Sequence, residues 1–123
     1  FFFFDLVKVN FTKGMEQILK NAYKSENLNE AGTAAYFLSL YGGKENREFI
    51  EKRYLRWVDE WKSRIADFNN PTLEKAMREQ KGFQVNVVSA LKNAKSWKLN
   101  KAELIRLKQT CFSNDCLGYF PDK

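Results

Sequence analysis

The most regular hydrophobic pattern in the chain lies in "NREFIEKRYLRWVDEWKSRIADFNNP", residues 46–71. Its apolar positions recur at intervals of three and four: Ile50, Tyr54, Trp57, Trp61, Ile65 and Phe68. This spacing places them along one face of an α-helix. Asn70-Pro71 marks the end, because proline disfavours helical geometry in the residue before it. The pattern predicts one long amphipathic helix.

Two shorter helical patterns precede this segment. The first follows Thr12, a suitable N-cap, and repeats apolar residues at helical spacing. The second begins near Asn29 and ends at Gly42-Gly43, where glycine readily adopts the conformation that closes a helix. The apolar face of the first helix consists of Met15, Ile18, Leu19 and Ala22.

The region after Pro71 is less uniform. "TLEKAMREQK" predicts a short helix that begins at this proline and ends at Gly82. The next run, "FQVNVVSALKNAK", places Val85, Val88 and Leu91 on one helical face. Its "VNVV" portion also has the β-branched composition of a strand, so both interpretations remain open.

The last predicted helix has a distinct start. Asn100 and Glu103 have the spacing of a capping box, and Leu99 and Leu104 stand where a hydrophobic staple places apolar residues. We expect this helix to run to about Cys111. Five or six short helices with short connections predict an all-α fold of antiparallel hairpins, arranged as an irregular bundle or a short helical stack.

Two stretches have a similar order of features: "AAYFLSLYGGKENREFIEKRYL" and "NVVSALKNAKSWKLNKAELIRLK". Each reads as an apolar helix, a turn rich in Gly, Lys or Asn, and an amphipathic second helix. This order resembles HEAT-like helical-hairpin repeats, in which paired helices stack into a curved array. The resemblance implies a surface that binds proteins rather than catalysis.

The length of 123 residues predicts a single domain, residues 1–123, which is large enough to bury about two-thirds of its unfolded surface. The aromatic content is high, and tryptophan with arginine is typical of binding hot spots. Trp57, Trp61 and Trp97 are therefore candidate interface residues. For Trp57 and Trp61, helical spacing favours the alternative, in which both pack in the core.

The net charge of +6 is concentrated toward the C-terminus. Residues 71–123 carry ten basic and five acidic side chains, whereas residues 1–70 are nearly balanced. A basic surface can contact nucleic-acid phosphates, anionic lipid or an acidic protein, or can simply be a solvated face. The candidate basic surface consists of Lys92, Lys95, Lys98, Lys101, Arg106 and Lys108.

The chain contains no histidine, which excludes a histidine general base and a histidine-ligated zinc ion. Two cysteines without histidine do not complete a usual structural zinc site, so we expect no metal. No glycine-rich phosphate loop, dinucleotide-binding pattern or G-x-S-x-G motif is present. We therefore expect no cofactor, no catalytic residues and no enzymatic activity.

Cys111 and Cys116 are the only cysteines. The "FSND" run between them favours a chain reversal that would bring them within disulfide reach, and free thiols are the alternative. The apolar run Phe1–Phe4 reads either as the remnant of an export signal or as a terminal segment packed on the core. Asn10 begins a formal glycosylation sequon. We expect a periplasmic or secreted protein, with a cytoplasmic one as the alternative.

These observations favour a non-enzymatic protein-binding domain of the cell envelope or exterior. An inhibitor or a toxin-neutralising immunity protein is one concrete form. Its basic C-terminal helices would steer it toward a partner with an acidic surface. The alternative is an intracellular nucleic-acid-binding protein that uses the same basic residues. No segment is apolar enough to predict a transmembrane helix.

Overall fold

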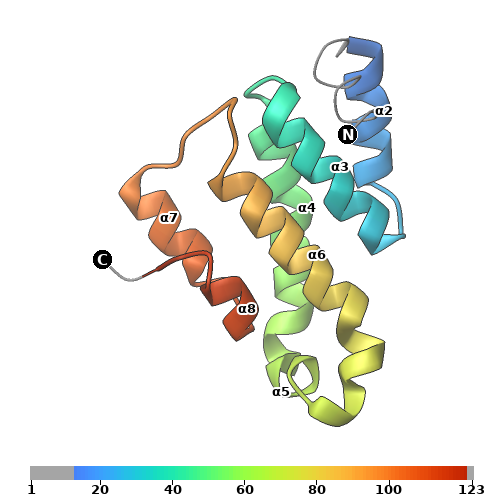
Figure 1. Ribbon diagram of the computed structural model, residues 1–123, viewed down its shortest axis with the longest axis vertical. Coiled ribbons are helices and arrows are strands. Elements are labelled where there is room, and N and C mark those ends of the chain that lie inside the picture. Colours follow the sequence, from blue (N-terminus) through green and yellow to red (C-terminus); the bar gives the residue numbers. More distant parts are fainter. Residues whose placement is uncertain (1–12, 122–123) are drawn as a thin grey trace.

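The two helices at the centre of the structure pack closely because one of them presents small residues. In this computed structural model, which describes residues 13–121, α3 lies along α6 (Figure 1). Ala31, Ala34 and Ala35 of α3 are buried, and Gly32 faces α6 so closely that an added Cβ would lie 3.0 Å from the Cβ of Asn86. The described helices are α2 (Lys13–Tyr23), α3 (Leu28–Tyr41), α4 (Asn46–Trp61), α5 (Ile65–Phe68), α6 (Glu74–Lys92), α7 (Lys101–Lys108) and α8 (Asn114–Leu117).

The all-α fold class is confirmed, since residues 13–121 contain helices and turns and no strand. α2 packs on α3, and α4 contacts both α3 and α6. The C-terminal helices α7 and α8 lie on the opposite side of α6 from α2 (Figure 1). The predicted N-cap Thr12, the run Phe1–Phe4 and the sequon at Asn10 lie outside the described residues.

The predicted end at Gly82 and the strand interpretation of "VNVV" are both wrong, because α6 continues through this glycine. Phe83, Val87 and Leu91 are fully buried along one face of that helix. Burial of three large apolar side chains outweighs the cost of about 1 kcal/mol for one glycine in a helix.

The long helix that was predicted to continue to Asn70-Pro71 is also interrupted. α4 ends at Trp61, a 3₁₀ turn covers Lys62–Arg64, and the short α5 follows. Ile65 is 41% exposed, whereas Phe68 is completely buried. The tighter 3₁₀ turn changes the direction of the side chains, so Phe68 enters the core and Ile65 leaves it.

The start of α7 agrees with its predicted signature. The Asn100 side chain accepts a hydrogen bond from the Glu103 backbone amide, and the Glu103 carboxylate accepts one from the Asn100 amide, both at 2.8 Å. This capping box fixes where α7 begins and therefore which of its residues share a face. The helix ends at Lys108, three residues before the expected end at Cys111.

Candidate functional site

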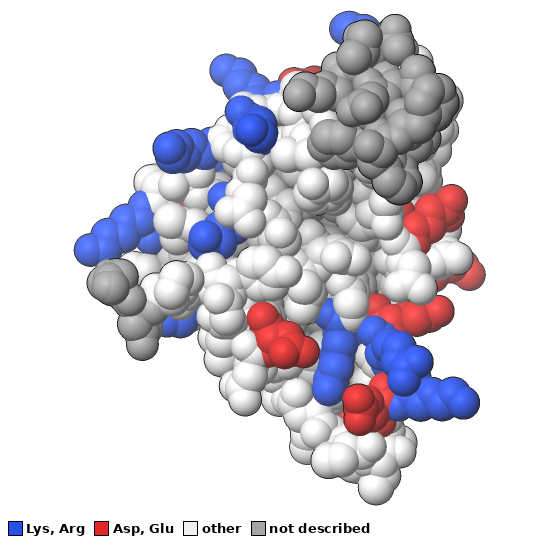
Figure 2. All heavy atoms as spheres, viewed as in Figure 1, with Lys and Arg blue, Asp and Glu red and all other residues white. Residues whose placement is uncertain are grey.

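Helical geometry divides the predicted basic surface between two sides of α7. Lys101 and Lys108 stand seven residues apart and therefore share one side of the helix with Ile105. Arg106 lies on the side that faces α4. The six candidate basic residues thus do not form one continuous site. Figure 2 shows Lys and Arg side chains concentrated on the left of this view, where α7 and the connection before it lie.

The side of α7 that carries Lys101, Ile105 and Lys108 borders a shallow groove of about 470 Å³. Apolar side chains form part of its lining, and one of them, Ile105, is 49% exposed. Three lysines also line the groove, and among the described residues no carboxylate lines it. We call it the lysine groove; it is lined by Lys92, Lys101, Leu104, Ile105, Lys108, Phe120 and Pro121.

The end of the chain forms one wall of the lysine groove. Cys111 and Cys116 have their Cα atoms 5.4 Å apart and their sulfur atoms at bonding distance, as the turn between them predicts. Ser113 caps α8 by accepting a hydrogen bond from the Cys116 amide at 3.3 Å. These contacts bring Phe120 back toward α6, where the Lys92 ammonium lies 5.9 Å from the ring centroid.

Lys95 and Lys98 lie in the connection between α6 and α7, and both are exposed. The backbone of this connection is nevertheless attached to the core. The Lys95 amide donates to the Ser39 carbonyl at 2.9 Å, and the Ser96 hydroxyl donates to the Gly42 carbonyl. The two lysines therefore add positive charge above a fixed backbone without lining the lysine groove.

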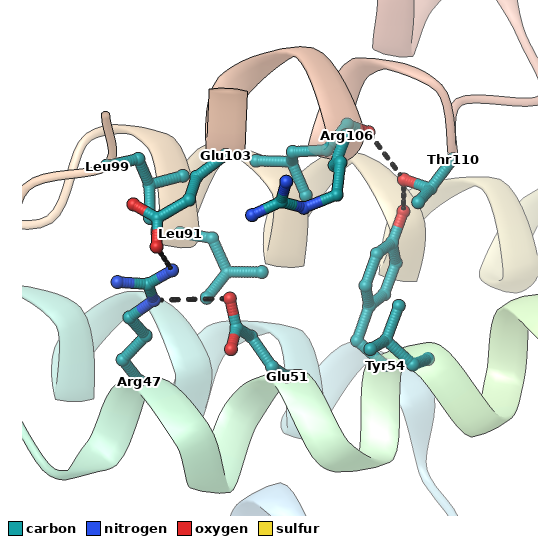
Figure 3. A pocket seen from close by; sticks show the side chains of 10 residues that line it. Arg47, Glu51, Tyr54, Leu91, Leu99, Glu103, Arg106 and Thr110 are labelled. Atoms are coloured by element: carbon teal, nitrogen blue, oxygen red, sulfur yellow. Dashed lines mark hydrogen bonds and ion pairs between the residues drawn. The ribbon is translucent and has the colours of Figure 1, made fainter. Parts of the chain in front are cut away.

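Arg106 lies beside a second pocket, of about 250 Å³, between α4 and α7 (Figure 3). Arg47 bridges two carboxylates in this pocket, Glu103 at 2.5 Å and Glu51 at 3.2 Å. The hydrogen bond from Arg47 holds the pKa of Glu103 below its usual range. Because its acidic residues already pair with Arg47, this pocket links α7 to α4 and offers little unbalanced charge.

A buried polar network holds the segment after α7 in place, and sequence analysis did not identify it. Gln84 of α6 donates to the Tyr54 hydroxyl at 3.0 Å and to the Thr110 carbonyl at 2.8 Å, and it accepts from the Phe112 amide at 3.0 Å. Burial raises the pKa of Tyr54 to about 12, so this hydroxyl stays protonated. A glutamine within an apolar helical face is the only signal for this network in the sequence.

The tryptophans do not form an exposed interface. Trp57 and Trp61 are 6% and 8% exposed and belong to the hydrophobic core, the alternative that their helical spacing favours over an interface. Trp57 packs against Phe68, Phe83 and Phe112, with ring centroids 5.5–5.9 Å apart. Large aromatic rings at helical spacing reach the core because burying them gives the largest gain.

Trp97 lies in the connection before α7 and is only partly buried. Its indole nitrogen donates a hydrogen bond to the Leu91 carbonyl at 3.2 Å. The ring packs against the edge of the core. Trp97 therefore anchors this connection and does not line the lysine groove.

A second basic cluster, which sequence analysis missed, surrounds a hollow of about 290 Å³ between α2 and α4. Its basic residues come from the nearly balanced first half of the chain, so the charge count concealed them. The sequence feature that could have indicated this cluster is the pair of arginines three residues apart on α4. The lysine after α2 joins them only in the folded chain. We call it the arginine pocket; it is lined by Tyr23, Lys24, Phe49, Lys52, Arg53 and Arg56.

No family model, curated protein or solved structure matches this chain in the comparisons with known proteins. Among residues 13–121, no group of three or more cysteine or acidic side chains is placed to hold a metal ion. Over the same residues, no helix has both the length and the hydrophobicity required to cross a membrane.

Proposed function

We propose that this chain is a non-enzymatic protein-binding domain of the cell envelope or exterior that uses the lysine groove to bind a partner with an acidic surface. The observation that carries the proposal is that apolar side chains and three lysines line the groove together, with no carboxylate among its described lining residues. Protein interfaces commonly place apolar contacts at the centre and charged residues around them. An inhibitor or a toxin-neutralising immunity protein has this type of function.

The two parts of the groove would contribute differently to binding. Lys92 and Lys101 at the border, with Lys95 and Lys98 nearby, would raise the association rate with an acidic partner. Ile105 and the other apolar side chains would then slow dissociation as they lose contact with water. The location of Cys111 and Cys116 at bonding distance is consistent with an oxidising compartment and supports an exported protein.

The direct test is photo-crosslinking in the native cells, with a benzophenone amino acid in place of Ile105. We expect a discrete crosslinked protein, and Lys92→Glu with Lys101→Glu should reduce its yield at least tenfold. The matched charge reversal on α6, Lys75→Glu with Arg78→Glu, should leave the yield unchanged, and a crosslinker at exposed Ala76 should capture nothing. The proposal is contradicted if no crosslinked protein forms in the cells and the purified protein turns over a substrate.

The alternative function, nucleic-acid binding, is supported by the basic residues outside the groove. Lys95, Lys98 and Arg106 are exposed, do not line the lysine groove, and carry charge beyond what an apolar groove requires. This function requires binding to DNA or RNA that weakens steeply between 50 and 200 mM salt, on the order of 10³-fold if six phosphates are contacted. Absence of binding at 50 mM salt would exclude it.

A further inference from the structure

In the arginine pocket, Arg53 forms no ion pair with a carboxylate of the described residues. Arg53 stacks its guanidinium over the rings of Tyr23 and Phe83, with distances of 5.5 and 5.3 Å to the centroids. Within residues 13–121, its hydrogen-bond partner is the backbone carbonyl of Tyr23, and no carboxylate bonds to it. A charge that is partly removed from water is normally paired with an opposite charge.

Other positive charges converge on the same hollow. Arg56 follows Arg53 by three residues on α4, so both guanidinium groups lie on neighbouring positions of one face. Burial lowers the pKa of Arg53; Tyr23 and, more weakly, Glu60 oppose this shift, while the nearby charge of Arg56 adds to it. Lys52 and Lys24 supply two more charges at the border of the pocket. The arrangement therefore carries repulsion between like charges that a bound anion would relieve.

The neighbouring acidic residues do not neutralise this cluster. Glu26 and Glu60 line an adjoining hollow that also touches Arg53 and Arg56. Glu60 acts on Arg53 electrostatically, but neither carboxylate forms an ion pair with these arginines in the described part of the chain. They would restrict the anion to the side of the arginines that faces Lys24, where the described lining residues include no acid.

Phe49 forms the apolar wall of the pocket. The ammonium groups of Lys20 and Lys24 lie 5.0 and 5.9 Å from its ring centroid. These contacts keep both lysines near the hollow through cation–π attraction. The volume of about 290 Å³ is sufficient for one phosphate group with part of the molecule that carries it.

We propose that the arginine pocket binds the phosphate group of a phosphate ester. Arg53 and Arg56 would donate hydrogen bonds from their planar guanidinium groups, which match phosphate oxygens in geometry. Lys24 and Lys52 would supply flanking charge, and Phe49 would contact the group attached to the phosphate. The lysine groove takes no part, so this site is independent of the proposed function.

The experiment is an NMR titration of the ¹⁵N-labelled protein that follows the side-chain Nε–Hε signals of Arg53 and Arg56. The probes are inorganic phosphate, adenosine diphosphate and a short single-stranded oligonucleotide, with potassium chloride added at matched ionic strength as a separate series. We expect saturable shifts with the phosphate probes that chloride does not reproduce. Tighter binding of the diphosphate would identify a small ester, and tighter binding of the oligonucleotide would identify a polymer; either supports the site.

Two exposed side chains provide the variants, so the fold is preserved. Lys52→Gln with Arg56→Gln should weaken binding of the tightest phosphate probe at least tenfold. Lys75→Gln with Arg78→Gln, the same loss of charge on α6, should leave the affinity unchanged. The proposal is overturned if no probe gives a saturable shift, if chloride gives the same shift, or if both double variants bind equally.

Discussion

Gln84 is the single polar residue whose loss should cost most stability. It is completely buried, and it forms three hydrogen bonds that join α6 to Tyr54, Thr110 and Phe112. Gln84→Met preserves the length of the side chain but leaves the Thr110 carbonyl and the Phe112 amide without these partners. Buried groups left unsatisfied cost about 1–3 kcal/mol each, so we expect a loss of about 2–4 kcal/mol. Urea unfolding measures it.

The same substitution at an exposed glutamine provides the control for that measurement. Gln109 lies just after α7 and is exposed. Gln109→Met should change the free energy of unfolding by less than about 0.5 kcal/mol. Equal effects at the two positions would mean that the buried network contributes nothing.

Two carboxylates should make the protein less stable in acid. Hydrogen bonds from the Asn46 side chain to Glu16, and from Arg47 to Glu103, hold the pKa values of these groups below the ordinary 4.5. A lowered folded-state pKa gives stability that is present above pH 4.5 and is lost as the pH falls through the lowered values. In urea unfolding at pH 7, 5, 4 and 3, Glu16→Gln with Glu103→Gln should flatten this decline. An unchanged decline would contradict these assignments.

Single residues also show what could be predicted before the structure was known. The capping box of Asn100 and Glu103 depends on local sequence alone, and its prediction was correct. The approach of Cys111 and Cys116 was predicted because a turn-forming run separates them. The role of Gln84 was missed because its partners come from α4 and from residues 110–112, and such contacts leave no local pattern.

At the scale of helices, Gly82 is a position where the sequence is not optimal for its own fold. It lies inside α6, and an added Cβ would meet nothing within 4 Å. Gly82→Ala should therefore stabilise the protein by about 0.5–1 kcal/mol, since alanine has less backbone entropy to lose on forming a helix. Thermal and urea unfolding would detect this gain.

Gly32 on α3 provides the matched control for Gly82. A Cβ at this position would lie 2.8 Å from Nδ2 and 3.0 Å from Cβ of Asn86, closer than ordinary contact. The strain of such crowding cancels the gain in helix propensity. We expect Gly82→Ala to exceed Gly32→Ala in stability by about 1 kcal/mol or more. If the two variants were equally stable, close packing of α3 on α6 would not be the reason for this glycine.

The errors in the predicted helices have one physical origin. The local sequence predicted that a helix ends at Gly82 and that another continues through Ile65. The burial of apolar side chains in the core produced the opposite result at both positions. α6 continues because apolar residues on both sides of its glycine reach the core. The stripe is interrupted after Trp61 because the core accepts Phe68 and has no place for Ile65. Such choices depend on the other helices.

At the scale of the whole molecule, folding brings together charged residues that lie far apart in the sequence and separates others that lie close. The positive C-terminal half was expected to form one surface, and α7 divides it. The nearly neutral first half forms the arginine pocket, since Lys24 and the arginines of α4 meet only after folding. Net charge over a segment therefore located one candidate site and concealed the other.

The tail after Cys111 should couple the redox state of the protein to the shape of the lysine groove. Phe120 and Pro121 line the groove, and they follow the short loop that Cys111 and Cys116 close. Loss of this bridge should lower the free energy of unfolding by about 2–3 kcal/mol through loop-closure entropy.

Urea unfolding with and without a phosphine reductant measures this difference, and Cys111→Ala with Cys116→Ala should be insensitive to the reductant. Because the groove loses a wall when the tail separates, reduction should also decrease crosslinking at Ile105 while leaving phosphate binding in the arginine pocket unchanged. Equal loss at both sites would instead indicate that reduction unfolds the whole domain, because the arginine pocket lies between α2 and α4, away from the tail. Loss of crosslinking at Ile105 with unchanged phosphate binding would show that the bridge acts on the groove alone.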